Sequence, residues 1–317
     1  MFEIPTALVK LYAHWDKHAN YKIDITTNDF DQQIYSEIIE FVNERMEIFA
    51  QKDSRKPPPW SRDPIFMQYR FCNIYRELDR QTIFFHKLLK PYKNDLAYWL
   101  LNMMFCRYIC DPKTITKVGL IGFDRSRNQT VYEKLNQLAS PKYGVAYIFP
   151  ISSIQKTQFD TREKFFCFYL PAVASQIAGE IEMFKDISVI DALDRLIPIF
   201  KFNHRFHLTE VLIDLAYQYP AKIDLFKGFP IGPGSIPTMK RLDSSMVPED
   251  VVIDLVHSKP KDLSYLTLKG NQIPLSAENW EGIGCEFRKY SNLREGRGRK
   301  RKYSPSTNPI NSDNIHA

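Results

Sequence analysis

The chain has 317 residues, of which 44% are hydrophobic and 25% charged, and its formal net charge is +6. This composition is typical of a globular protein with a substantial core. Because no apolar run approaches the roughly 20 residues needed to cross a bilayer, we expect no membrane association. The N-terminus lacks the basic start and long apolar run of a signal peptide. Five scattered cysteines indicate reduced thiols, which predicts a cytoplasmic location, or a nuclear one in a eukaryote.

The positive charge is concentrated at the C-terminal end of the chain. Residues 288–317 contain eight basic and two acidic side chains, whereas residues 1–287 are neutral. A neutral body with a basic extension favours a polyanionic partner, and nucleic acid is the commonest. A disordered solubilising or targeting tail would give the same pattern, so both interpretations stay open.

Helical patterns dominate the chain, so we predict a mainly α fold. Residues 1–32 form an N-terminal lead with a short strand at 21–25, and the helical domain covers 33–303. Helices are predicted over residues 33–51, 64–89, 95–110, 163–184 with an interruption at Pro171, 188–197, 207–217, 248–257 and 279–293, with one or two more in 114–138. Residues 145–152 could form a strand or a turn, and 304–317 are predicted to be disordered. The few strands and the absence of βαβ alternation indicate a single large helical domain with a basic C-terminal tail.

Segment 57–82, PPPWSRDPIFMQYRFCNIYRELDRQT, predicts a helix start and then one long helix with two different faces. Asp63 can cap the first N–H groups, and Pro64 suits the first helical position. An apolar stripe at three- and four-residue steps consists of Phe71, Ile74, Tyr75, Leu78, Thr82, Phe85 and Leu89. The opposite face carries Arg70, Asn73, Arg76, Glu77 and Arg80. Such a face suits phosphate or a base edge, and a surface salt-bridge ladder is the alternative.

Other polar groups could also carry chemistry, although P-loop, HExxH and GxSxG signatures are absent. Asp214 lies in the apolar run VLIDLAY, where a carboxylate must be paired, used or exposed. The loop GPGS at 232–235 could cradle an anion or be a simple turn. Glu286, Lys289 and Tyr290 share one helical face, as a proton-transfer set or a surface trio. Cysteines 106 and 110 are interpreted as core residues, because no cluster around them completes a zinc site.

These segments together resemble a known family. The run PWSRDPIFMQYRFCNIYRELDR resembles a pattern of phage DNA-hypermodification proteins, namely the 5-hydroxymethyluracil (5-hmdU) DNA kinase helical domain and the related α-glutamyl/putrescinyl-thymine pyrophosphorylase group. The matching residues are Trp60, Asp63, Pro64, Tyr69, Arg70, Phe71, Asn73, Tyr75, Arg76, Asp79 and Arg80. Three more elements follow in the family's order: IDLAY with Asp214, IGPGS at 231–235, and CEFRKYSNLREGRGRKRKY at 285–303. Segment 57–82 is the first element, and these are the second, third and fourth.

The resemblance implies a helical fold similar to that of helix-hairpin-helix glycosylases. It implies phosphoryl or amine transfer at the 5-methylene of 5-hmdU, or of its phosphorylated form, in DNA. The base would be flipped out of the duplex. DNA is the expected partner, with a P-loop kinase or other hypermodification enzymes. ATP or an amine is the expected co-substrate, and no other cofactor is implied.

The resemblance also implies roles for individual side chains, since an anionic leaving group needs cationic donors and an amine must lose a proton. The catalytic candidates are Asp214, Asp79, Arg76 and Glu286. The substrate-binding candidates are Arg70, Asn73, Arg80, Gly232, Gly234, Ser235, Lys289 and Tyr290. Arg297, Arg299 and Arg301 would grip the DNA backbone. We expect the arginines and Asn73 of the first element to face one pocket with Asp214.

Two other interpretations stay open. The chain could be a glycosylase-like protein that recognises or excises modified bases. It could also be a non-catalytic helical module that presents DNA to a separate kinase. The missing P-loop favours transfer onto an already activated base, or a nucleotide site of an unrecognised kind.

Overall fold

The computed structural model describes residues 6–19, 29–144, 149–154, 157–200, 204–300 and 302. The chain divides into two compact units, which are described separately. Unit 1 contains the chain up to Asp79 and from Leu225 onward, and unit 2 is Arg80–Asp224. The predicted strand at 21–25, the first half of 145–152, the tail at 304–317 and Arg301 lie outside the described residues. The second half of 145–152 contains the start of a 3₁₀ turn, η4 (Ile151–Ser153).

Both units are helical, which confirms the predicted mainly α class. Among the described residues, the paired strands are β1 (Thr267–Leu268) and β2 (Asn271–Gln272), which form a short antiparallel hairpin in unit 1. No described helix is both long enough and apolar enough to span a membrane. The similarity to helix-hairpin-helix glycosylases stays a prediction.

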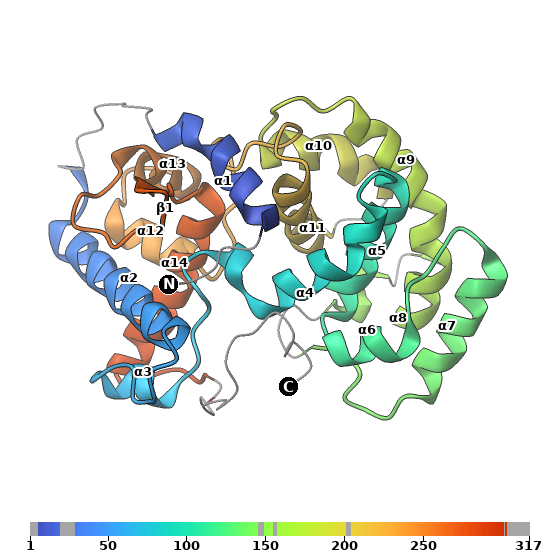
Figure 1. Ribbon diagram of the computed structural model, residues 1–317, viewed down its shortest axis with the longest axis horizontal. Helices are drawn as coiled ribbons and strands as arrows, with labels where there is room; N and C mark the ends of the chain where they lie inside the picture. Colours follow the sequence, from blue (N-terminus) through green and yellow to red (C-terminus); the bar gives the residue numbers. More distant parts are fainter. Residues whose placement is uncertain are drawn as a thin grey trace. The chain divides into compact units, whose positions relative to one another are not determined.

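Unit 1 is organised around its last helix, α14. Its helices are α1 (Thr6–Ala19), α2 (Gln32–Asp53), α3 (Pro64–Gln68), α12 (Ile236–Leu242), α13 (Pro248–Ser258) and α14 (Ala277–Arg294). Helix α14 begins at a capping box in which Ser276 and Asn279 satisfy each other's backbone N–H groups. It packs against α2, α12 and α13 and buries Trp280, Ile283 and Phe287 among them (Figure 1). Polar groups on its remaining faces are therefore held on a rigid support.

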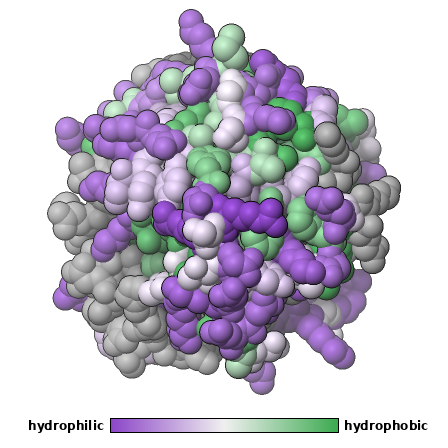
Figure 2. Space-filling view, turned by 90° about the vertical axis from the view of Figure 1, so that its right-hand side faces the viewer, coloured by the Kyte–Doolittle hydropathy of each residue, from purple (hydrophilic) through white to green (hydrophobic). Residues whose placement is uncertain are grey.

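Unit 2 is organised around α5. Its helices are α4 (Arg80–Leu89), α5 (Leu96–Ile109), α6 (Pro112–Val118), α7 (Arg125–Gln137), α8 (Arg162–Lys164), α9 (Leu170–Glu182), α10 (Val189–Phe200) and α11 (Arg205–Gln218). Asp95 caps α5, and every residue from 99 to 109 is buried, since α4, α6, α9 and α11 all contact this helix (Figure 1). Cys106 and Cys110 are buried, as predicted. Figure 2 views the side of the molecule that α7 faces, where hydrophilic residues cover most of the described surface and apolar residues form small separate groups.

The helix predicted over 64–89 is wrong in its middle. Asp63 caps α3 and Pro64 occupies its first turn, as predicted, but α3 ends at Gln68. The chain then runs through an extended segment and a 3₁₀ turn, η2 (Arg76–Leu78), before α4 begins at Arg80. The predicted apolar stripe is nevertheless buried throughout. The prediction that these apolar residues are buried is therefore confirmed, whereas the prediction of a single polar helix face is wrong.

The interruption predicted at Pro171 takes the form of a π-helical turn. Residues Phe165–Tyr169 form this turn, η5, between α8 and α9, and the N–H of Leu170 bonds to the carbonyl of Phe165. Proline has no N–H to donate to a preceding carbonyl, so a regular ladder cannot continue through Pro171. Helix α10, by contrast, continues past Pro198 to Phe200, beyond the predicted end at 197.

Candidate functional site

The first and fourth elements meet at the carboxylate of Glu286 on α14. Its Oε1 accepts a hydrogen bond from Lys289 Nζ at 2.7 Å, and its Oε2 accepts from Lys300 Nζ at 2.8 Å and from the N–H of Cys72 at 3.1 Å. Burial alone would raise the pKa of Glu286, but the charges of Lys300 and Lys289 lower it below its ordinary value. Glu286 is thus ionised and joins three segments, so the geometry does not support its role as a proton acceptor.

Residues 69–75, between α3 and η2, are held out of a helix by partners outside the segment. Arg45 of α2 is buried, and its Nη2 donates to the carbonyls of Phe71 at 3.2 Å and Cys72 at 2.9 Å. Tyr69 forms an isolated antiparallel bridge with Lys302. Backbone groups that bond to these partners are not available to a helix ladder, which is the physical reason that the predicted long helix is broken.

The polar side chains that were expected to share one helix face of the first element lie in different environments. Asn73 donates through Nδ2 to the carbonyl of Leu78 at 3.2 Å, and Asp79 accepts from the N–H of Asn73 at 3.3 Å, so these two side chains close the local turn. Arg76 lies 4.0 Å from Glu278. Arg70 is exposed, and Arg80 begins α4 in unit 2. The prediction that these residues line one helix face is therefore wrong.

Glu77, expected on the polar face, is buried instead. Tyr12 of α1 donates to its Oε1 at 2.7 Å. Burial, together with the neighbouring Glu278, raises the pKa of Glu77 to about 8. A proton thus neutralises this carboxyl at neutral pH, and Glu77 belongs to the core of unit 1.

The glycine-rich third element serves close packing. A Cβ at Gly234 would lie 2.5 Å from Cys285 Sγ, and one at Gly284 would lie 2.2 Å from Ser235 Oγ. The loop therefore approaches α14 as only glycine permits. The N–H of Gly232 donates to Glu281 Oε1 at 3.2 Å, and that of Ser235 bonds to the carbonyl of Gly232 at 3.0 Å. These two donors, expected to cradle an anion, are used within the protein.

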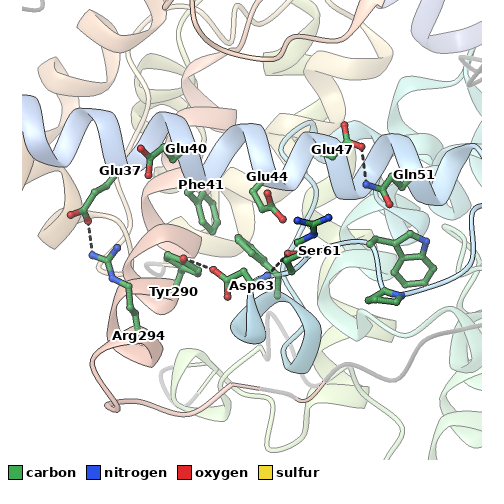
Figure 3. Close-up of a pocket in the computed structure, with 14 residues that line it drawn as sticks. Glu37, Glu40, Phe41, Glu44, Glu47, Gln51, Ser61, Asp63, Tyr290 and Arg294 are labelled. Atoms are coloured by element: carbon green, nitrogen blue, oxygen red, sulfur yellow. Dashed lines mark hydrogen bonds and ion pairs between the residues drawn. The ribbon is translucent and has the colours of Figure 1, made fainter.

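An acidic cavity of about 600 Å³ lies between α2 and the Trp60–Phe66 turn, and sequence reasoning missed it. Its lining residues are Glu37, Glu40, Phe41, Glu44, Glu47, Gln51, Pro59, Trp60, Ser61, Arg62, Asp63, Phe66, Tyr290 and Arg294. The four glutamates stand at steps of three, four and three residues along one face of α2 (Figure 3). That spacing was the available signal, since it places all four carboxylates on one helical face.

Tyr290 connects the two walls of the acidic cavity. Its hydroxyl donates to Asp63 Oδ2 at 2.6 Å, and its ring stacks on Phe66 with centroids 5.0 Å apart (Figure 3). Burial and the Asp63 charge raise the pKa of Tyr290 well above its ordinary value. Arg294 pairs with Glu37 at 2.7 Å, whereas half-buried Glu44 extends from α2 toward the turn that contains Ser61. The cavity thus combines aromatic walls with several carboxylates.

Asp214 lies in the core of unit 2. Its carboxylate is fully buried and accepts from Arg107 Nη2 at 2.7 Å and Nε at 2.5 Å, with His86 Nε2 3.0 Å from Oδ1. Arg107 also donates to Thr82 Oγ1 at 3.0 Å. Burial would raise the pKa of Asp214, but Arg107 and His86 hold it well below its ordinary value. The geometry supports a structural ion pair instead of a base, and Arg107 and His86 were missed by sequence reasoning.

Two of the residues expected to contact the DNA backbone, Arg297 and Arg299, follow α14 and are exposed. Lys289, expected to bind substrate, is exposed on α14 beside Glu286. His204 and His207, two basic residues at the start of α11, are buried against aromatic rings, including that of Tyr108, and so are not placed to contact DNA.

These observations define a mainly α-helical protein in which the first, third and fourth elements converge on one helix with a basic segment at its end. The family model for the 5-hmdU DNA kinase, helical domain, matches residues 32–299, and the chain belongs to this family. Membership implies a role in the modification of 5-hmdU DNA, with DNA as the substrate and a kinase as a partner. No curated protein and no solved structure matches the chain.

Proposed function

We propose that the chain is a transferase that places an amine on the 5-methylene of phosphorylated 5-hmdU in DNA, with the base held in the acidic cavity. One observation carries this proposal. Trp60 and Asp63 of the first element and Tyr290 of the fourth, more than 200 positions apart in the sequence, line the same cavity. Elements of the family's pattern therefore meet at a concave site with polar groups, the usual form of a ligand pocket.

The walls of the cavity suit a flipped pyrimidine. A base in a duplex must leave the stack before an enzyme reaches its 5-substituent. Trp60, Phe66 and Tyr290 supply aromatic faces that could replace the lost stacking. Tyr290 and Asp63 supply polar groups for the base edge in place of Asn73, whose side-chain amide is used in its own turn.

The charge of the cavity favours amine transfer over phosphoryl transfer from ATP. Five carboxylates line it, against the cations of Arg62 and Arg294. Carboxylates attract a protonated amine and repel the triphosphate of ATP, whereas the phosphoryl group of the base carries less charge and has Arg62 to offset it. The amine is thus the co-substrate that this cavity favours, and the phosphorylated base is supplied by a kinase partner.

Glu44 is the carboxylate that we assign as the base. It accepts a proton from the ammonium group, and the free amine attacks the 5-methylene carbon. A C–N bond forms while the C–O bond to phosphate or pyrophosphate breaks, and the leaving group departs with the bonding electrons. Arg62 takes up the charge of the leaving group. Exposed Arg70 and half-buried Arg80, expected to bind the phosphate of the substrate, stay candidates for that role.

A second candidate function is a non-catalytic module that binds 5-hmdU DNA for a separate kinase. One observation favours it. The three carboxylates expected to be catalytic all accept hydrogen bonds from other groups of the protein, namely Asp79, Asp214 and Glu286.

Mass spectrometry of digested nucleosides separates the two functions. DNA that contains 5-hmdU or its phosphorylated form is incubated with the protein and with either ATP or a diamine. The transferase predicts a nucleoside heavier than 5-hmdU by the mass of the amine minus that of water, formed only from phosphorylated DNA and lost in Glu44→Gln. Glu133→Gln, a matched change on the exposed face of α7, should retain it. Tight DNA binding without any product would instead support the binding module.

A further inference from the structure

A second concave surface, the arginine groove, lies between α12 and the C-terminal half of α14. It has a volume of about 400 Å³. Its lining residues are Pro237, Thr238, Arg241, Arg288, Asn292, Glu295 and Arg297. Neither Arg241 nor Arg288 was among the residues expected to bind DNA.

The spacing of residues on α14 separates the groove from the acidic cavity. Arg288, Asn292 and Glu295 follow one another by four and three positions and so share one face. Tyr290 and Arg294, which line the acidic cavity, are four positions apart on a different face. Arg241 joins the groove from the last turn of α12.

Two glycines bring Arg297 back to the groove. Helix α14 ends at Arg294, and Gly296 and Gly298 have φ values of 70° and 83°, a conformation that residues with a Cβ rarely adopt. The turn lets the N–H of Arg297 donate to the carbonyl of Asn292 at 2.7 Å. A Cβ at Gly298 would also lie 3.4 Å from Asn292 Cβ. The fourth element therefore contains a G-R-G turn whose geometry sets the edge of the groove.

The groove carries an excess of positive charge at the ends of two helices. Arg241 lies at the C-terminal end of α12, and Arg297 follows that of α14, where helix dipoles stabilise cations. Arg297 pairs with Glu295, and Arg288 Nη1 donates to the carbonyl of Pro233 at 3.0 Å, which ties the groove to the third element. Three arginines thus face one carboxylate.

Guanidinium groups recognise phosphate oxygens through paired N–H donors, so this lining suits a phosphate. The lining includes no aromatic side chain on which a nucleobase could stack. The base of a free nucleotide would therefore have no side chain to stack on, whereas a backbone phosphodiester requires only the guanidinium groups as hydrogen-bond donors. Lys300 of the basic C-terminal segment forms an ion pair with Glu286 at 2.8 Å. Because this cation is already paired within the protein, the groove supplies part of the phosphate binding that was expected of the basic segment.

We propose that the arginine groove binds a phosphodiester of the DNA backbone while the acidic cavity receives the base. This inference rests on DNA being the substrate in the proposed function, but it does not depend on which group is transferred.

The test is DNA affinity, measured by fluorescence anisotropy over a range of salt concentrations. In Arg241→Gln/Arg288→Gln the dissociation constant should rise by about tenfold and the salt slope should fall by about one to two, because phosphate contacts release counterions. The control Lys113→Gln/Arg125→Gln removes two exposed cations from unit 2 and should change affinity less than about twofold. Circular dichroism checks that both variants fold.

Three outcomes would overturn the inference. The first is an equal loss of affinity in groove and control variants, which would show a general charge effect. The second is unchanged DNA affinity in the folded groove variant. The third is competition by ATP at concentrations far below those needed with inorganic phosphate, which would show a nucleotide site. The proposed function fails separately, when wild-type protein binds DNA in the groove but yields no modified nucleoside at saturating DNA.

Discussion

The two sides of α14 in unit 1 differ in charge although they are built on one helix. The side with Tyr290 and Arg294 borders a cavity rich in carboxylates, whereas the side with Arg288 and Asn292 borders the arginine groove. The excess of arginine on one side favours anions, whereas the excess of carboxylates on the other favours cations, apart from the positions of Arg62 and Arg294. Residue spacing on a single helix is therefore enough to keep two surfaces of opposite net charge apart.

The largest effect is expected at Asp214, which tests whether the chemistry lies at α14 or in unit 2. Asp214→Asn leaves Arg107 buried without its counter-charge and should lower the free energy of unfolding by about 3–5 kcal/mol. Urea denaturation measures this loss. His86→Gln, which keeps a donor near Asp214, is the control and should cost less. Full stability combined with lost turnover would move the active site to unit 2 and break the comparison.

Glu44→Gln tests the role of the acidic cavity. Removal of the proposed base should lower turnover by about a hundredfold. DNA affinity should not change, because Glu44 is not in the arginine groove. Anisotropy and product formation are measured on the same preparation. A Glu44 variant with weakened DNA binding and normal turnover would reverse the two assignments.

Gly284→Ala tests whether the close approach of the third element shapes the groove. The added methyl group would meet Ser235 Oγ at 2.2 Å and the Met239 side chain at 2.4 Å. Overpacking of this kind should cost about 1–3 kcal/mol in thermal or urea unfolding and should weaken DNA binding with it. Gly282→Ala, whose Cβ would meet nothing within 4 Å, is the matched control. Equal stability of the two variants would contradict the close packing.

The smallest effect concerns the pH dependence of stability in unit 1. The pKa of Glu77 is raised in the folded state, so its contribution is complete below the ordinary glutamate pKa and is lost as the pH rises toward 8. Between pH 6 and 8 the free energy of unfolding should fall by at most about 1.4 kcal/mol per pH unit. Urea titrations at several pH values measure the slope, and Glu77→Gln should flatten it. A slope that survives this substitution would assign the titration to another group.

Local sequence patterns predicted most helices but not the course of the first element. Asp95 before an apolar run marked α5, and Asp63-Pro64 marked the start of α3, since caps act within one turn. The break after Gln68 depends on Arg45 and Glu286, which lie 26 and 214 positions from the backbone groups that they bind. Hydrophobic periodicity depends on residues a few positions apart, so it cannot indicate hydrogen-bond partners that are this distant in the sequence.

The candidate site shows the same division. The Glu286–Lys289 pair follows from three-residue spacing on one helix and was expected as neighbours. The acidic cavity forms because the glutamates of α2 lie beside Trp60 and Tyr290 in the fold. No local sequence pattern predicts that these three segments come together. Asp214 stood out as a carboxylate in an apolar run, but only Arg107 on another helix decided that it is an ion pair.

The sequence by itself determined the helical class, most helix starts, the location of the positive charge and the motif pattern of the 5-hmdU DNA kinase helical domain. Long-range packing decided which carboxylates are engaged, that residues 69–75 are not helical, and that α14 separates two surfaces of opposite charge. The physical reason is the range of the interactions. Caps and helical faces form within a few residues, whereas a buried charge is stabilised by whichever distant side chain the fold brings beside it.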